Sequence, residues 1–340
     1  MAKAVTTLGD VAEMAGVSKS TVSRILNNKI GNGFSVKDDI RKRVIEAARK
    51  LNYKPNLIAQ SLCLQKSRMI HIVGGHHALS DLGNIYQTVV NNAIRVLESS
   101  EHVFDVTVDM SNHQPNVSEL PAWRIDGVII LAKTSDVTLN ELEQNGTPYV
   151  VVNGPAGPSG VSVVPDDLGG MKLAIEYLYE NGHRKIAYAN APPVHLFKHK
   201  SIIDRQQSYL DTMTKLGLKP VGGFDQWLES PEDFLEQNVL KNDITAVVAY
   251  GHMGGLNLLQ ASHKLNIKVP EHLSLLCFCD EFAAGVLSPK LSFIDIRSLA
   301  LGEKSAELLL DKIEKKQNYT QNKFVIQERL ILRSSTAKIK

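Results

Sequence analysis

From Arg68 onward, short apolar runs alternate with segments in which apolar residues recur at helical spacing. Strands that alternate with helices form parallel sheets with helices on both faces, and this length of chain accommodates two such lobes. Ligands of such folds bind in a crevice beyond the carboxyl ends of the strands. Strands are expected over Met69–Val73, Val103–Val108, Gly127–Leu131, Tyr149–Val152, Lys185–Ala189, Ala246–Ala249 and Leu273–Cys279. Helices are expected over about Tyr86–Ser99, Gly169–Asn181, Asp204–Leu216, Gly254–Leu265 and Gly302–Lys315.

The first 68 residues differ in charge from the rest of the chain. They contain 13 Lys and Arg residues and five Asp and Glu residues, a net charge of +8, whereas the remainder carries −6. Phosphate contacts require clustered Lys and Arg, although a basic face exposed only to solvent has the same composition. The asymmetry favours a nucleic-acid-binding headpiece on an acidic body.

The N-terminal segment has the pattern of two short helices joined by a tight turn. Thr7 followed by Asp10 is typical of a helix N-cap, and Gly16 allows the turn that ends the first helix. Ser18 is a suitable N-cap for the second helix. The apolar residues at helical spacing are Val11, Ala12, Met14, Ala15, Val22, Ile25 and Leu26. Lys19, Ser20, Ser23, Arg24 and Asn27 point elsewhere, as the recognition helix of a helix-turn-helix requires.

A third helix follows, with apolar residues on one face and basic residues on the rest of its surface. Its apolar residues at helical spacing are Ile40, Val44, Ala47, Ala48 and Leu51. Its remaining surface is basic: Arg41, Lys42, Arg43, Arg49 and Lys50. Three short helices of this kind can enclose a minimal core.

Residues 7–27 read TLGDVAEMAGVSKSTVSRILN, and this run resembles the DNA-binding headpiece of the lactose, galactose and purine repressor (LacI/GalR) family. The following LNYKPN at residues 51–56, with Ala59 and Leu62, is similar to the family's third-helix end and hinge helix. The connection from Asn27 to Ile40 is longer than is usual in the family, and its glycines indicate a solvent loop.

The resemblance implies roles for individual side chains. Lys19 and Ser20 would reach base edges, and Arg24 could bind guanine through two hydrogen bonds; simple solvent exposure is the alternative for Lys19 and Ser20. Ser18, Thr21, Ser23 and Asn27 would mainly contact phosphates. The complete expected set of DNA contacts is Thr7, Ser18, Lys19, Ser20, Thr21, Ser23, Arg24, Asn27, Asn56, Ala59 and Leu62.

Residues 55–64 are expected to form the family's hinge helix. Pro55 suits the first helical position, but a helix this short is marginal in water by itself. The resemblance implies that the two hinge helices of a dimer order together in the minor groove, where Leu62 inserts at the central base step and kinks the duplex. The alternative is that Leu62 packs against the core.

The core also carries stretches that resemble the family. These are RIDGVII at 124–130, GHRKIA at 182–187, VPEHLS at 269–274 and ERLILRSST at 328–336. They imply two doubly wound parallel-sheet lobes, similar to periplasmic binding proteins, with a small-molecule effector such as a sugar or sugar derivative between them. The chain ends soon after Thr336 without a leucine heptad, so a homodimer is expected rather than a tetramer.

Four residues are expected at the effector site. Arg205 resembles the family's ligand-binding arginine, and Asn153 follows a strand at a position where the family often has an acid. Trp227 could stack on an apolar sugar face, and Tyr250 follows the strand that ends at Ala249. Structural packing is the alternative for Asn153 and Trp227.

Three departures from the family concern this site. Tyr250-Gly251 stands where the family has Asn-Asp, Ile296 replaces a glutamine, and Phe278-Cys279-Asp280 replaces Phe-Asp-Asp. Two polar contacts are therefore expected to be lost. Either the effector is not a simple free sugar, or other groups replace these contacts.

Two other classes of protein are alternatives to this interpretation. An enzyme is not expected, because no phosphate-binding loop follows a strand, and Gly154–Gly160 contains prolines that lack N–H donors. His76-His77 and Cys277-x-Cys279 lack metal-ligand spacing, so neither a metal nor a cofactor is expected. A small-molecule sensor with degenerate DNA binding is the alternative function.

The sequence thus predicts a three-part chain: a headpiece over 1–54, a hinge helix and linker over 55–67, and a two-lobed core over 68–340. Neither a signal peptide nor a membrane span is expected, and three scattered cysteines fit a reduced cytoplasm. The expected function is sequence-specific repression of a catabolic operon, with double-stranded DNA carrying a pseudo-palindromic operator as the partner.

Overall fold

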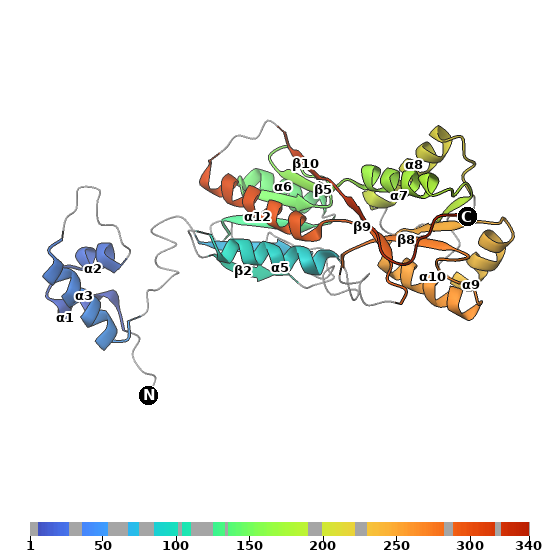
Figure 1. Cartoon of the computed structure of the whole chain (residues 1–340). Helices are drawn as coiled ribbons and strands as arrows, with labels where there is room; N and C mark the ends of the chain where they lie inside the picture. The colour runs from blue at the N-terminus through green and yellow to red at the C-terminus, as the bar shows by residue number, and fades with distance from the viewer. Residues whose placement is uncertain are drawn as a thin grey trace. The chain divides into compact units, whose positions relative to one another are not determined.

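The computed structural model describes residues 6–26, 36–53, 67–74, 85–100, 104–109, 125–132, 135–189, 199–221, 230–281, 288–316 and 321–339 (Figure 1). The chain divides into two compact units, Met1–Ser67 and Arg68–Lys340. Within the described residues, none of the helices is both long and apolar enough to cross a membrane.

The first unit contains three helices around a small apolar core. α1 (Leu8–Ala15) begins with a capping box between Thr7 and Asp10 and ends at Gly16, whose φ of 64° is the left-handed conformation that glycine readily adopts. α2 is Lys19–Leu26 and α3 is Asp38–Lys50. The buried residues come from all three helices: Val11, Ala12, Ala15, Val22, Ile25, Val44 and Ala47. Met14 was expected on the apolar face but is 51% exposed.

The N-lobe of the second unit is built on a six-stranded sheet in the order β10-β5-β4-β3-β1-β2. Its strands are β1 (Met69–Val73), β2 (Asp105–Val108), β3 (Gly127–Leu131), β4 (Tyr149–Val152), β5 (Val161–Pro165) and β10 (Lys323–Ile326). All neighbouring strands pair in parallel.

Successive residues of the N-lobe strands point to opposite faces of the sheet. Leu131 of β3 packs in one cluster with residues of α5 (Ile85–Glu98) and α12 (Ser298–Glu314). Ile130, one residue earlier, packs with residues of α6 (Asp136–Asn145) instead. Helices therefore cover both faces of this sheet.

The C-lobe is built on a five-stranded sheet in the order β11-β9-β8-β7-β6. Its strands are β6 (Ile186–Ala189), β7 (Ala246–Ala249), β8 (Ser274–Cys279), β9 (Ser292–Asp295) and β11 (Arg329–Ile331). β11 is antiparallel to β9, and the other pairs are parallel. Its helical elements are α7 (Asp167–Glu180), α8 (Lys200–Lys215), α9 (Pro231–Phe234), the π-helix η4 (Leu235–Leu240) and α10 (His252–Lys264).

The chain passes between the lobes three times, from β5 to α7, from β9 to α12 and from β10 to β11. These crossings, residues 165–167, 295–298 and 326–329, are called the lobe hinge below. The third crossing is bonded to both others. The Asp166 N–H donates to the Ile326 carbonyl oxygen (3.0 Å), and Arg329 Nε donates to Asp295 Oδ2 (2.9 Å).

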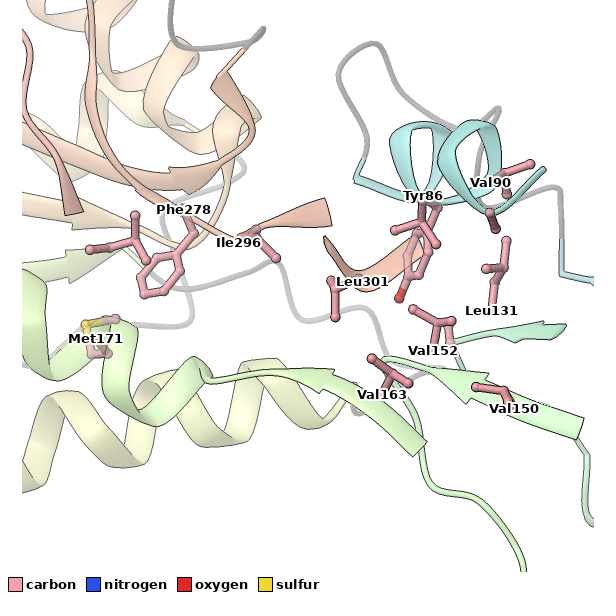
Figure 2. Close-up of a cluster of buried hydrophobic side chains, with 14 of the residues drawn as sticks. Tyr86, Val90, Leu131, Val150, Val152, Val163, Met171, Phe278, Ile296 and Leu301 are labelled. Carbon is pink, nitrogen blue, oxygen red and sulfur yellow. The ribbon is translucent and has the colours of Figure 1, made fainter. Parts of the chain in front are cut away.

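One buried apolar cluster continues from lobe to lobe. Figure 2 shows Phe278 and Met171 of the C-lobe at one end, Leu131 and Val152 of the N-lobe at the other, and Ile296 of the lobe hinge between them. A second cluster lies wholly within the C-lobe, and a third wholly within the N-lobe. The lobes are thus coupled by packing as well as by the chain.

The expected α/β fold, with a helical N-terminal unit and two sheet-based lobes, is confirmed. The expected bounds of β1, β3, β4 and β7 match those observed. The antiparallel β11 is a local exception to the expected parallel sheets. β5, β9, β10, β11, α6 and α9 were not predicted.

Candidate functional site

The N-terminal end of α2 presents three hydroxyl groups bonded to one another. Ser18 Oγ accepts the Thr21 backbone N–H (3.2 Å), so the expected N-cap is confirmed. The same oxygen lies 2.8 Å from both Ser20 Oγ and Thr21 Oγ1. No acidic residue lies in the first turn of α2. This helix end can therefore approach a phosphate with N–H groups, hydroxyls and the positive end of its dipole.

Exposed basic side chains lie at both ends of α2 and on α3. Lys19 is the first residue of α2, Arg24 lies in its last turn and Arg43 belongs to α3, and all three are exposed. A Cβ atom built on Gly9 would lie 3.1 Å from Lys19 Cε, so Lys19 lies across the start of α1 beside Asp10. The Thr7 backbone N–H lowers the pKa of the Asp10 carboxyl, and Lys19 adds to that effect. Lys19 would have to turn away from α1 to reach a base edge.

The remaining headpiece positions fall into two groups. Thr7 caps α1 and is exposed, and Thr21 and Ser23 are half-buried on α2. Asn27, Asn56, Ala59 and Leu62 lie outside the described residues, so their expected DNA contacts remain predictions. Trp227, expected at the effector site, also lies outside them.

In the core, a chain of hydrogen bonds links two of the expected effector residues across the lobes. Asn153 Nδ2 donates to Tyr86 Oη (3.1 Å), and His199 Nε2 lies 3.3 Å from that oxygen. On the other side of the imidazole, Ser201 Oγ lies 2.5 Å from His199 Nδ1 and 3.0 Å from Tyr250 Oη. Tyr86 and Asn153 belong to the N-lobe, and the other three residues belong to the C-lobe. These hydrogen bonds, called the interlobe chain below, therefore depend on how the two lobes are arranged.

The imidazole of His199 is neutral in this arrangement. Burial, followed by the positive charge of Arg205, lowers the pKa of His199 to about 4. Because the Ser201 backbone N–H donates to Nδ1 (3.3 Å), Nδ1 is the acceptor and Nε2 carries the proton. The donor of His199 therefore points toward the N-lobe.

Arg205 already makes two short hydrogen bonds within the protein. Its Nε donates to Asp167 Oδ1 (2.6 Å) and its Nη1 to the Tyr250 carbonyl oxygen (2.6 Å). Its guanidinium carbon lies 4.0 Å from the Phe278 ring centre and 4.8 Å from that of Tyr250. Burial works against the charge of Arg205, but Asp167 beside it raises the guanidinium pKa. Arg205 thus has a structural role, and a ligand that takes its Nε would have to compete with Asp167.

Two of the residues at which the chain departs from the family are buried in apolar clusters. Cys279 and Ile296 are 1% and 4% exposed and pack in the apolar clusters. Cys279 Sγ lies 3.8 Å from Cys277 Sγ, which confirms that both point to the same face of β8. Asp280 accepts a hydrogen bond from Ser298 Oγ (2.6 Å). None of the described residues form a group of three or more metal-ligating side chains.

Sequence reasoning missed Tyr86, His199 and Ser201, which complete the interlobe chain. Tyr86 was placed only at the start of a helix, and the helix containing Ser201 was expected to begin four residues too late, at Asp204. His199 is the N-cap of α8, a position that a hydrophobic period does not mark. His199 is half-buried beside Arg205 as a result of the tertiary fold, which the local sequence does not indicate.

Because His199 is neutral in the fold, we expect the free energy of unfolding to depend on pH. In the unfolded chain this histidine takes up a proton near pH 6.5, whereas in the fold it does so only near pH 4. The contribution of neutral His199 to the free energy of unfolding is therefore complete above pH 6.5 and is lost as the pH falls toward 4. Between pH 7 and pH 5 the loss is about 2 kcal/mol.

Urea unfolding at pH 7 and pH 5 measures this effect. His199→Gln should lose about 2 kcal/mol less than the unmodified protein over that interval. His263→Gln, at an exposed position of α10, should keep the original pH dependence. Equal pH dependence in the His199 variant and the unmodified protein would show that this imidazole is not held neutral.

Comparison with known proteins matches both units. Residues 7–56 match the model "Bacterial regulatory proteins, lacI family", and residues 175–336 match a periplasmic binding protein-like domain. The HTH-type transcriptional regulator RegA of Clostridium saccharobutylicum is 27% identical, with 97% of this chain and 99% of that protein covered. The HTH-type transcriptional repressor PurR of Mannheimia succiniciproducens is 26% identical, with 98% and 99% covered.

Solved structures show the same fold. A lac repressor dimer bound to operator and the anti-inducer ONPF is similar with a TM-score of 0.79 and 22% identity, covering 98% of this chain and 99% of that one. A CelR–cellobiose complex is similar with a TM-score of 0.65 and 24% identity, covering 97% and 99%. The two family matches together span more than half of the sequence, and the relatives align over nearly all of it. By these matches, the chain combines a helix-turn-helix domain of the lacI family of bacterial regulatory proteins with a periplasmic binding protein-like domain.

Proposed function

We propose that this protein binds a pseudo-palindromic operator as a homodimer and represses transcription in the cytoplasm, under the control of a small-molecule effector held between the lobes. The observation that carries the proposal is the end of α2, where exposed hydroxyl and basic side chains stand on a helix without an acid in its first turn. Support comes from relatives that are named transcriptional repressors and from the operator-bound dimer of similar fold.

The interlobe chain supports the effector part of the proposal. Asn153, Tyr86, His199, Ser201 and Tyr250 offer amide, phenol, imidazole and hydroxyl groups from both lobes. A ligand that replaces these bonds alters the contacts by which one lobe holds the other, so its binding is linked to their relative orientation. Similar folds contain cellobiose and ribose, which favours a sugar or sugar derivative as effector.

Selection of random double-stranded DNA by the purified full-length protein tests the proposed function. A recovered pseudo-palindrome with a central CG step is the expected result, since a symmetric dimer reads two inverted half-sites and inserted side chains kink flexible pyrimidine–purine steps most easily. If no sequence is enriched, either alone or after addition of a metabolite extract, the operator-binding proposal fails and a sensor with degenerate DNA binding becomes the better account.

Arg24→Ala is expected to weaken binding to the selected operator by about 1–3 kcal/mol, because a two-bond contact with guanine is lost. Binding to unrelated DNA should change much less. Titration of both DNAs by fluorescence anisotropy at one salt concentration measures the difference. Arg49→Ala, at an exposed basic position of α3, is the control and should weaken both complexes equally if it contacts phosphate alone. Equal losses for Arg24→Ala would contradict base recognition by this residue.

A further inference from the structure

Glu328 lies in the third crossing of the lobe hinge, between β10 of the N-lobe and β11 of the C-lobe. The residue is 6% exposed, and neither carboxyl oxygen has a hydrogen-bond partner among the described residues. A Cβ atom on Gly170 would lie 1.7 Å from Glu328 Oε2, so the carboxyl group rests against the backbone of α7 where only glycine leaves room. Buried carboxylates are normally paired, so an unpaired one at a crossing between the lobes requires an explanation.

The charges that face Glu328 come from several elements. Arg205 on α8 is the cation near it, and Asp167 of α7, Asp166 before α7 and Asp295 of β9 are the acids. Arg205 has already given its Nε to Asp167 and its Nη1 to the Tyr250 carbonyl. On the other side of the hinge, Arg329 gives its Nε to Asp295. An ionised Glu328 would therefore add a negative charge that these two arginines do not balance through a direct bond.

We propose that Glu328 holds a proton at the lobe hinge, and that the protein releases this proton when the lobes rearrange. In the arrangement described, the carboxyl group lies against Gly170, beside which the apolar Ile294 side chain also lies, and these surroundings favour the neutral acid. Burial first, and the three neighbouring aspartates next, raise the pKa of Glu328 well above its ordinary value, against the opposing effect of Arg205. Movement of the crossings would expose the carboxyl to water or to Arg205 and favour its ionised form.

The consequence is a linkage between pH and lobe orientation. A rise in pH favours any arrangement in which Glu328 is ionised and disfavours the one described. Protons would then act on the same equilibrium that an effector acts on, without occupying the effector site. The crossing segment suits this role because it is bonded to both other crossings.

The first test is the unfolding of the full chain between pH 5 and pH 8, which needs no DNA. We divide the unfolding equilibrium constant of the unmodified protein by that of Glu328→Gln. This ratio should rise by up to tenfold per pH unit, because the folded protein holds a proton that the unfolded chain releases. Glu328→Leu should show the same trend, even if its packing differs. Glu271→Gln, at an exposed position, is the control and should give a constant ratio. A constant ratio for Glu328→Gln would overturn the proposal.

The second test follows the lobes directly. Spin labels at Val137→Cys on α6 and Leu240→Cys on η4, both exposed positions, report the distance between the N-lobe and the C-lobe. Cys63→Ser removes the third cysteine, while Cys277 and Cys279 are buried. Between pH 5 and pH 8 the distance distribution should shift in the otherwise unmodified protein and stay constant in Glu328→Gln. An identical shift in both proteins would show that Glu328 does not couple protons to the lobes. Neither test depends on operator binding, so failure of the proposed function would remain distinguishable.

Discussion

Arg205→Ala is expected to lower the free energy of unfolding by about 3–5 kcal/mol, because it removes one partner of a buried ion pair. The Arg205 and Asp167 side chains are only 5% and 6% exposed, so Asp167 would stay buried without its cation. The substitution also removes the donor to the Tyr250 carbonyl and the guanidinium that packs on Phe278. Loss of charge pairing, of a hydrogen bond and of packing act in the same direction.

Denaturant unfolding of three variants separates these effects. Replacing both partners, as Arg205→Met with Asp167→Leu, should recover much of the lost stability, since an apolar pair leaves no buried charge unpaired. Lys185→Ala provides a surface comparison, because the Lys185–Asp243 pair is 55% and 84% exposed and should contribute no more than about 1 kcal/mol. A loss for Arg205→Ala as small as that for Lys185→Ala would show that the buried pair is not important for stability.

The position of Arg205 changes how the effector site is understood. The resemblance predicted an arginine that awaits a ligand, and the structure places it between two rings and a carboxylate. A ligand that binds Arg205 must displace Asp167 or the Tyr250 carbonyl oxygen, or else use the remaining nitrogen of the guanidinium. The energetic cost of that exchange links ligand recognition to α7, the first element after the β5 crossing.

The sequence predicted those parts of the fold that one dominant local signal controls. β3, GVIIL, is an uninterrupted apolar run because both faces of the strand are buried, and its bounds were correct. β10 and β11 were missed because they are short and only partly buried, and β5 because it ends in a proline. β10 and β11 take their places in the sheets by pairing with β5 and β9, which lie far from them in the sequence.

Helix ends show the same limit. α7 begins earlier than the apolar period suggests, because its first turn carries an acid and two glycines that the period does not count. For the candidate site, Asn153 and Tyr250 could be located because each follows a strand, where side chains gather. Tyr86 and His199 join them only through contacts between the lobes, and Glu328 becomes unusual only when its burial and unpaired oxygens are known.

Phe278→Ala is expected to lower the free energy of unfolding by about 3–5 kcal/mol, because it leaves a cavity in the apolar cluster that both lobes share. Phe278 is 1% exposed and belongs to the cluster that continues through Ile296 into the N-lobe (Figure 2). Phe293→Ala is the matched control, since Phe293 is also 1% exposed but belongs to the cluster confined to the C-lobe. The two substitutions remove the same side chain from neighbouring strands of one sheet, so their total losses should be similar.

Their effects on the N-lobe should differ, and hydrogen exchange measured strand by strand can detect this. In Phe278→Ala, amides of β3 and β4 should exchange faster, because the cavity opens in the cluster that includes Leu131 and Val152. In Phe293→Ala, faster exchange should be confined to the C-lobe strands. Equal exchange of β3 and β4 in the two variants would mean that the lobes are packed independently. Movement would then pass between the lobes through the hinge crossings alone, and a group such as Glu328 would be the main point at which it could be controlled.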